Sequence, residues 1–399
     1  MMDTMYELLE HMEGRPVINT HSHHLNNIYN GDYNLDILLR NSYVNWCGVS
    51  FEDSYSSRRD FLDAMRYNSY FMWLQKSLKS IYNLMEPLTA DNWYVYSEKI
   101  REKHNSQSEH IELLKSGCGY RKIILDAYWE PGSNNGLPEL FTPTFRVDMF
   151  LAGYNRIARD HSGNNASIIY NKNINDIDEY TAFMKAAILE KKQQGCVALK
   201  CAIAYSRGID FAETPKEEAQ KALGISGHKS DSGEIKAFQD YLFFTICKIA
   251  AEYDLPLQCH TGLGKLEKSN AMRLQEAISK NPETKFILFH CGYPWLDDIN
   301  GLLHVYPNVY PDLCWLPLIS TSAAIRMLHE LIEVGTADKF CWGCDTWTSE
   351  ESYGALLAAR HVLANVLADR IKQGYLNTNE ACTIADSIMC NNARKLYKI

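Results

Sequence analysis

The feature of this sequence that most restricts its fold is a series of short apolar segments along the whole chain. Each segment ends in polar or reactive residues, and most are followed by a stretch whose apolar residues have the spacing of a helix, which is the pattern of repeated βα units. The expected strands are 16-PVINTH-21, 122–129, 144–150, 196–203, 255–260, 285–290, 308–313 and 339–345. Eight such units predict an α/β protein with a (β/α)8 TIM-barrel fold, whose chemistry lies at the carboxyl ends of the strands.

The first two expected strands are separated by about a hundred residues, which is too long for a simple βα connection. Apolar residues recur there at three- and four-residue spacing, which is typical of helices with one apolar face. They are Phe61, Leu62, Met65, Phe71, Met72, Leu74, Leu78 and Ile81. We therefore predict a single domain over residues 1–399, in which residues 25–120 form a mainly helical insertion over the barrel mouth.

Charge and hydropathy exclude several classes of partner. The chain has 49 acidic and 40 basic residues, a formal charge of −9, and no block of Lys and Arg that would follow a phosphate backbone. Its most apolar segment, 241–251, contains Lys248 and is too short to cross a bilayer. Residues 1–13 lack the basic start and apolar core of a signal peptide. We expect a cytoplasmic protein that acts on a small molecule, without nucleic acid or membrane partners; a homo-oligomer is left open.

Histidines and one aspartate stand where expected strands end. His21 and His23 form an H-x-H at the first strand, and alternate residues of a strand share a face, so both imidazoles can point into the barrel mouth. His260, His290 and Asp345 end the fifth, sixth and eighth expected strands. A single buried histidine is more often structural than a ligand, but that interpretation would have to hold several times at the same relative position. The pattern predicts a metal centre.

With these residues the sequence resembles the amidohydrolase superfamily, which has an H-x-H on strand 1, histidines on strands 5 and 6 and an aspartate on strand 8. It is most similar to the amidohydrolase-2 branch, in particular to nodulin/FluG-like amidohydrolase domains and their uronate isomerase relatives. Segments that carry the resemblance are 199-LKCAIAYSRGID-210, 260-HTGLG-264, 289-FHCGYP-294, 308-NVYPDL-313, 343-GCDTWTSE-350 and 391-NNARKLY-397. Relatives often have Pro where this chain has Ser349.

The resemblance implies that His21, His23, His260 and Asp345 hold one divalent metal ion. Asp345 would also take the proton of a water molecule whose pKa the metal lowers to roughly 7. His290 would polarise the substrate or move a proton, and is not expected to be a ligand. Zinc is the expected ion for a histidine-rich site, and manganese, iron or nickel could use the same ligands.

Lys200 has three interpretations. A carboxylated lysine at this place bridges two metals in some amidohydrolases, a free ammonium would bind a substrate carboxylate, and a buried ion pair would be purely structural. Lys200, Tyr205 and Arg207 resemble the nodulin-like pattern, so we favour anion binding and a single metal. Arg146 and Trp129 are further candidates for binding the substrate, although packing explains them equally well.

The sequence therefore predicts a metal-dependent hydrolase that acts on a C–N or C–O bond of a small, carboxylated metabolite. An isomerase similar to uronate isomerases, or a decarboxylase, is the alternative, because the same ligand set supports those reactions. A non-catalytic barrel is disfavoured since no expected ligand is missing.

Overall fold

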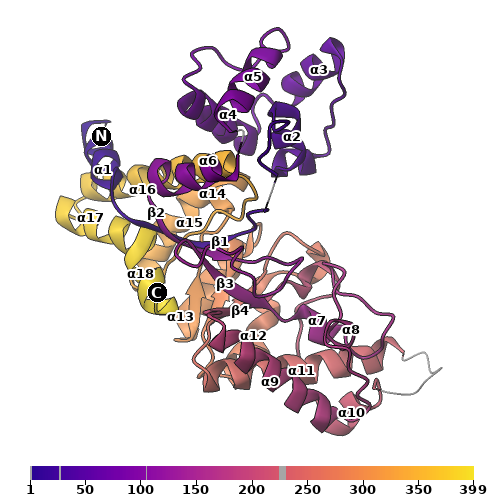
Figure 1. Cartoon of the computed structure of the whole chain (residues 1–399). Helices are drawn as coiled ribbons and strands as arrows, with labels where there is room; N and C mark the ends of the chain where they lie inside the picture. The colour runs from indigo at the N-terminus through magenta and orange to yellow at the C-terminus, as the bar shows by residue number, and fades with distance from the viewer. Residues whose placement is uncertain (1, 27, 105, 224–230) are drawn as a thin grey trace.

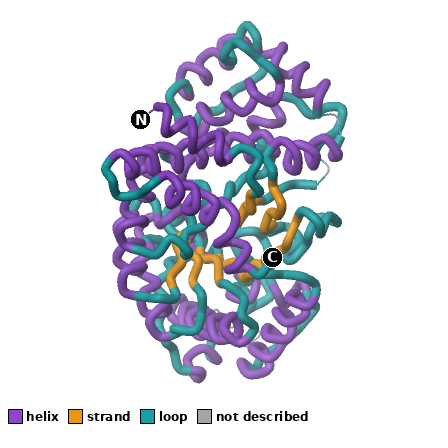
Figure 2. Tube along the Cα trace, turned by 90° about the vertical axis from the view of Figure 1, so that its left-hand side faces the viewer, coloured by secondary structure: helices purple, strands orange, loops and turns teal. Residues whose placement is uncertain are grey.

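The computed structural model describes residues 2–26, 28–104, 106–223 and 231–399 as an α/β fold around a curled sheet (Figure 1). Its seven strands are all parallel and pair in sequence order. They are β1 Val17–Ser22, β2 Tyr120–Leu125, β3 Phe141–Arg146, β4 Ala198–Cys201, β5 Leu257–Cys259, β6 Phe286–Leu288 and β7 Val309–Pro311. In Figure 2 the strands lie in the middle of the molecule with helices around them.

The segment 341–345, which lies between β7 and the long helix at 349–372, is hydrogen-bonded on the β1 side and on the β7 side of this sheet. Thr20 N donates to Trp342 O and Asp345 N donates to His21 O on the β1 side. On the β7 side Leu313 N donates to Cys341 O, and an isolated parallel bridge joins Asp312 to Cys341. The expected strand at 339–345 is thus an irregular segment with one isolated bridge, and Asp345 at its end has a positive φ of 56°.

Gly343 allows this segment to lie directly against β1. A Cβ atom at this position would lie 2.6 Å from Thr20 Oγ1 and 2.8 Å from His21 N. Any other residue would push the chain that carries Asp345 away from the strand that carries His21.

Helices account for most of the remaining chain. The α-helices are α1 Met2–Met12, α2 Leu35–Arg40, α3 Tyr55–Met65, α4 Ser69–Tyr82, α5 Trp93–Lys103, α6 Gln107–Glu112, α7 Asp148–Leu151, α8 Ala166–Ile169, α9 Ile177–Gln193, α10 Lys216–Gln220, α11 Ser232–Glu252, α12 Gln275–Lys280, α13 Leu296–Val305, α14 Leu316–Ile319, α15 Thr321–Val334, α16 Ser349–Lys372, α17 Thr378–Asp386 and α18 Asn392–Tyr397. The short 3-10 and π helices are η1 Tyr43–Cys47, η2 Leu113–Gly117, η3 Ile203–Tyr205, η4 Leu266–Lys268, η5 Ala271–Leu274, η6 Phe289–Gly292 and η7 Ser387–Asn391. No helix in the described ranges is both long and apolar enough to span a membrane.

The chain between β1 and β2 is helical, and α2 to α5 form a lobe at the top of Figure 1. Helix α4 packs against α16 through Trp73, Leu74 and Ser77, and Ser77 Oγ donates to Glu350 O. Helix α16 begins with a capping box in which Thr348 and Glu351 satisfy each other's backbone N–H groups. The start of α16, just after Asp345, is therefore fixed by the lobe.

The expected strands differ from the observed strands mainly at their ends. We placed the third strand at 144–150, but β3 ends at Arg146 and Asp148–Leu151 is helix α7. The second strand also ends earlier, at Leu125, so Asp126 is the first residue beyond it. At the C-terminal end the π turn of η7 lies between α17 and α18.

A separate apolar cluster fills the inside of the curled sheet. It contains Ile18, Ile124, Ala198 and Ile287 from four strands, together with Leu396 and Tyr397 from α18. Side chains inside the sheet are thus packed toward one end, and the polar residues discussed next lie at the carboxyl ends of the strands.

Candidate metal centre

The histidines and aspartates of the site lie where neighbouring parallel strands end. His21 belongs to β1, and His23 is the first residue after β1. His260 is the first residue after β5, and His290 is the second residue after β6. All four imidazoles are buried, as is Asp345. Because the carboxyl ends of parallel strands meet at one end of a sheet, residues that are far apart in the sequence converge there.

His23 faces two groups that can only accept hydrogen bonds. Its Nδ1 lies 2.8 Å from the backbone oxygen of Asp126, so Nδ1 carries a hydrogen. When this is the only hydrogen on the ring nitrogens, Nε2 carries a lone pair, and this atom lies 2.9 Å from Oδ1 of Asp345. A lone pair and a carboxylate oxygen attract each other only through a cation between them, which is either a proton or a metal ion.

A similar arrangement joins His260 and His290. The Leu263 carbonyl accepts from His260 Nε2, and the Cys314 carbonyl accepts from His290 Nδ1 at 2.9 Å. The remaining nitrogens, His260 Nδ1 and His290 Nε2, face each other at 3.1 Å. Burial lowers the pKa of His260 well below its usual value and lowers the pKa of His290 to about 4. Two neutral imidazoles therefore turn their lone pairs toward each other beside Asp345, whose Oδ2 is 3.6 Å from His290 Nε2.

His21 completes the group. Its Nε2 lies 3.8 Å from Asp126 Oδ2 and 3.9 Å from Asp345 Oδ1, beyond hydrogen-bond distance, and its Nδ1 has no hydrogen-bond partner among the described residues. Burial lowers the pKa of this ring well below its usual value, and Lys200 adds to the effect. The His21 ring is thus neutral, and one of its nitrogens has a lone pair that could bind a metal ion.

These atoms fit a divalent metal ion. Ligands bound to one zinc ion at about 2.1 Å lie roughly 3 to 3.5 Å from each other, and the separations around Asp345 lie near this range. Imidazole nitrogen and carboxylate oxygen are ligands that zinc and its neighbours in the transition series accept. Among the described residues two groups have ligand atoms that all lie within 4.8 Å of one another: His21 with His23 and Asp126, and His290 with Cys314 and Asp345.

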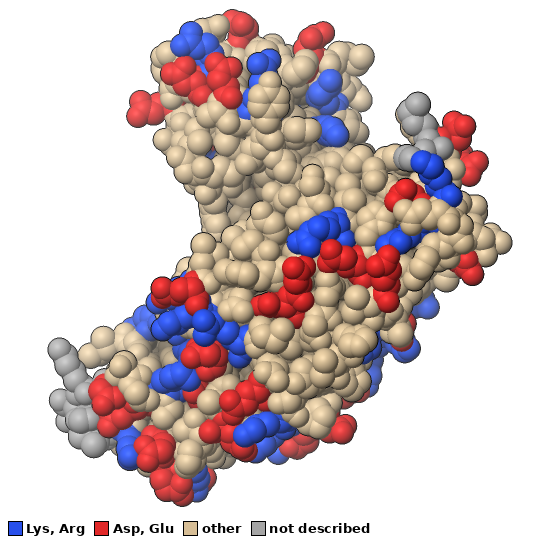
Figure 3. Space-filling model, turned by 180° about the vertical axis from the view of Figure 1, so that it is seen from behind, with Lys and Arg blue, Asp and Glu red and all other residues tan. Residues whose placement is uncertain are grey.

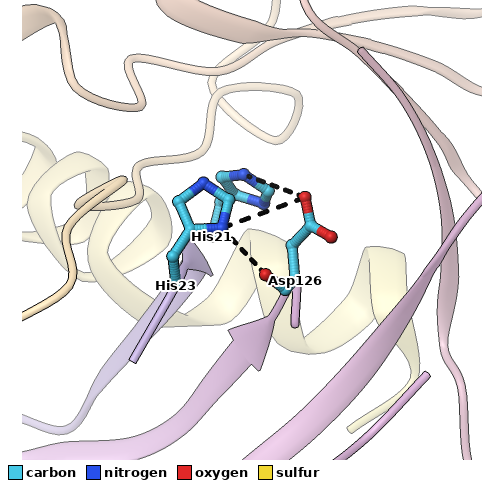
Figure 4. Close-up of side chains that lie close together, drawn as sticks. All are labelled: His21, His23 and Asp126. Atoms are coloured by element: carbon cyan, nitrogen blue, oxygen red, sulfur yellow. Dashed lines mark hydrogen bonds and ion pairs between the residues drawn. The ribbon is translucent and has the colours of Figure 1, made fainter. Parts of the chain in front are cut away.

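Asp126 faces His21 and His23 and was missed in the sequence analysis (Figure 4). Arg146 holds its carboxylate through Nε, 3.1 Å from Oδ2, and through Nη2. Burial alone would raise the pKa of Asp126, but Arg146 keeps it below its usual value. Arg146, expected to bind substrate, is thus committed to Asp126 and to Ser162 Oγ at 2.9 Å, although it does line the cavity.

Asp345 has a further partner from the helical lobe. Tyr43 Oη of η1 donates to Asp345 Oδ1 at 3.0 Å, and the backbone N of Tyr43 donates to Glu351 Oε1 at 3.2 Å. Burial alone would raise the pKa of Asp345, but a hydrogen bond from His23 and the charges of His21 and His23, when these rings are protonated, hold it well below its usual value. Asp345 is therefore ionised.

Lys200 on β4 is 1% exposed, and its Nζ lies 4.0 Å from the centre of the Phe289 ring. Among the described residues no hydrogen bond or ion pair of this ammonium group is found. Burial lowers its pKa, and the Asp126 and Asp345 carboxylates partly offset the effect. The described residues thus give no ion pair within 4.0 Å that would support a purely structural role, and Lys200 lines the cavity.

A cavity of about 310 Å³ contains these groups. It is lined by His21, His23, Tyr43, Trp46, Tyr128, Arg146, His161, Ser162, Lys200, Ala202, Tyr205, His260, Asp345 and Trp347. The Tyr205 ring lies 4.3 Å from the His260 ring and stacks on His161 at 4.5 Å.

Two expected substrate-binding residues lie elsewhere. The guanidinium of Arg207 turns to α11, where Nη1 donates to Asp240 Oδ1 at 2.9 Å. Trp129 is 36% exposed, and its neighbour Tyr128 lines the cavity instead. Both errors have the same origin, because the sequence does not show which way the chain turns after a strand.

The chain resembles known proteins over different lengths. Residues 198–399 match the family model described as amidohydrolase. Protein fluG of Emericella nidulans is 29% identical over 221 residues, which are 51% of this chain and 26% of that protein. The chain thus spans about a quarter of the length of this curated relative.

Solved structures with the same fold include two sugar-acid isomerases. The uronate isomerase of Thermotoga maritima superposes with a TM-score of 0.77 at 16% identity, covering 99% of this chain and 97% of that one. The glucuronate isomerase of Caulobacter crescentus gives a TM-score of 0.77 at 15% identity, with 99% and 94% covered. At these identities the likeness concerns the fold.

Proposed function

The chain belongs to the amidohydrolase superfamily, in its amidohydrolase-2 branch, and from this membership we propose that it is a metal-dependent hydrolase of a small, carboxylated metabolite. The bond that it cleaves would be a C–N or C–O bond. Two contacts near Asp345 carry the proposal. His23 Nε2 faces Asp345 Oδ1, and His290 Nε2 faces His260 Nδ1, so in each contact two electron-pair donors face each other and a metal ion could bind between them.

We infer that His21, His23, His260 and Asp345 hold one zinc ion. When bound, a divalent ion supplies Lewis-acid activation of water and of a substrate oxygen. Asp345 is ionised and can accept a proton from the attacking water at Oδ2, while Tyr43 holds Oδ1. His290 is neutral, with its hydrogen fixed on the Cys314 carbonyl, so its Nε2 can receive a proton and pass it to the leaving group.

Substrate binding would rest on Lys200. Its ammonium group is buried, lines the cavity and forms no ion pair within 4.0 Å in the described ranges, so a substrate carboxylate could pair with it directly. Tyr205 would pack along the substrate, since its ring lies against His260 on the cavity wall. The same need for a counter-ion favours a small anionic metabolite over a neutral substrate.

The segment 341–345 is proposed as the eighth strand position of a closed barrel, since it is hydrogen-bonded to β1 and to the segment after β7. Residues 25–120 would then be an insertion into one barrel domain. Their role would be to bring Tyr43 and Trp46 to the open end of the barrel.

An isomerase of sugar acids is the second candidate. It is favoured by the TM-score of 0.77 with two such isomerases and by the charged and polar side chains that line the cavity beside Lys200. Proton transfer between neighbouring carbons would use the same aspartate and histidines.

The proposal is tested by screening zinc-replete protein against uronic acids, N-acyl amino acids, amides and lactones. Hydrolysis of a carboxylated amide or ester, lost in Asp345→Asn, is expected. Turnover confined to uronic acids, with no hydrolysis, would replace the proposal with the isomerase.

A further inference from the structure

A second cavity, of about 450 Å³, lies beside the metal cavity. Tyr43, Trp46 and Tyr205 line both, so the two cavities adjoin at these rings. We call the second one the lateral cavity. Its walls are more apolar, because none of its lining residues is charged and they include Trp46, Leu263, Leu266, Trp315 and Ile319.

The lateral cavity lies between the helical lobe and the rest of the chain. Trp46 belongs to η1 of the lobe, whereas Leu266 begins η4 after β5 and Ile319 ends α14. Seen from behind, the molecule is hollowed between the lobe and the lower part, and the visible walls of this hollow carry few charged side chains (Figure 3).

Two large apolar side chains that line this cavity are partly exposed to solvent. Trp46 is 56% exposed and Leu266 is 51% exposed, and they come from opposite walls. Clustered exposed apolar groups of this kind mark binding surfaces, because covering them releases ordered water. The continuity with the metal cavity through Tyr43, Trp46 and Tyr205 indicates that the covering group is attached to the molecule held at the metal.

We propose that the substrate has two parts: a carboxylated head in the metal cavity and an aromatic or branched aliphatic arm in the lateral cavity. The inference rests on the proposed metal site and names the substrate class that this site takes. A sugar acid carries a hydroxyl group on nearly every carbon and would leave these hydroxyls against apolar walls without partners. A carboxylated amide or ester with an apolar arm matches both cavities.

The test compares two hydroxamic acids, which bind metals through the same group and differ in the arm. Acetohydroxamic acid has none, and 3-phenylpropionohydroxamic acid has an arm that ends in a phenyl ring. Binding to the full-length chain is measured by calorimetry with zinc and with zinc removed. The phenyl compound is expected to bind at least about tenfold more tightly, since the ring leaves water for the apolar walls.

Leu266→Asp should abolish this gain by placing a charge in the lateral cavity. Ile169→Asp is the matched control, since Ile169 on α8 is 50% exposed and does not line either cavity. Equal affinity of the two compounds for the wild-type chain, or an unchanged ratio in Leu266→Asp, would overturn the proposal. If zinc does not affect the binding of either compound, the metal site is wrong; the ratio and its response to Leu266→Asp still decide on the arm.

A crystal structure with the phenyl compound gives an independent answer. The ring is expected between Trp46 and Leu266, and a ring that lies elsewhere overturns the proposal whatever the hydroxamate group binds.

Discussion

Replacing Asp345 with asparagine should stabilise the metal-free protein while it abolishes metal binding. In the metal-free state Oδ1 of Asp345 faces the lone pair of His23 Nε2 at 2.9 Å, and the carboxylate is buried. An asparagine amide in the same place donates one hydrogen to His23 and a second to the oxygen of Tyr43, which lies 3.0 Å away. When His23 Nε2 carries a lone pair, the substitution turns a repulsive contact into a hydrogen bond.

The size of the effect follows from this exchange. One new buried hydrogen bond and the removal of one buried charge that faces an imidazole lone pair should raise the free energy of unfolding by about 1 to 3 kcal/mol. The unfolding entropy of a chain of 399 residues is about 0.8 kcal/mol/K, so the melting temperature should rise by about 1 to 4 °C. Zinc at a thousand times its Kd stabilises the wild-type chain by about 4 kcal/mol, and this increment should vanish in the variant.

Thermal unfolding of both proteins, with zinc and with zinc removed, measures the two effects. Asp240→Asn is the matched control, because Asp240 is also buried but its oxygens accept from Arg207 and from Lys236. The same chemical change there removes two ion pairs and should destabilise the protein by about 1 to 3 kcal/mol with or without zinc. If Asp345→Asn lowers the melting temperature of the zinc-free protein as the control does, His23 is a protonated partner of Asp345 and the lone-pair argument fails.

Three further results are expected. His290→Ala should keep the zinc, measured by elemental analysis, and lose at least about tenfold in rate, because His290 would move a proton and not hold the ion; loss of zinc would make it a ligand. Gently purified protein should contain one metal per chain and an intact mass without carbon dioxide on Lys200, and two metals with a carboxylated Lys200 would contradict the single-metal site. Burial raises the pKa of Asp148 to about 7. Between about pH 4 and 7 the folded chain therefore binds more protons than the unfolded chain, so the free energy of unfolding falls as the pH rises through this window. Asp148→Asn should flatten this part of the curve of unfolding free energy against pH, and parallel curves would refute the assignment.

The residues of the metal centre could be located from the sequence because their positions follow a local rule. His21, His23, His260 and His290 each stand at the end of an apolar strand, and parallel strands bring such ends together whatever the loops do. Asp126 obeys the same rule, directly after 123-IIL-125, and could have been found by applying it to β2.

Other parts of the site depend on how loops and the lobe turn, which no local pattern shows. Arg207 and Lys200 are only seven residues apart, yet the 3-10 turn of η3 separates them, and Arg207 ends at Asp240 on α11. Tyr43 could not be predicted at all. It reaches Asp345 across about 300 residues of sequence, and nothing in its own segment marks a site.

Tyr43 also explains how the lobe takes part in the chemistry. Its backbone N is held by Glu351 at the start of α16, its hydroxyl donates to Asp345, and its ring stacks on Trp315 with centres 4.3 Å apart. The same residue thus fixes the orientation of an expected metal ligand and forms part of the wall between the two cavities. Metal ligands come from the strand ends, whereas the apolar walls come from the lobe and the loops. In a fold of this kind the reaction type can stay constant while the substrate changes with the lobe, which is why the lateral cavity is the place to look for what this enzyme acts on.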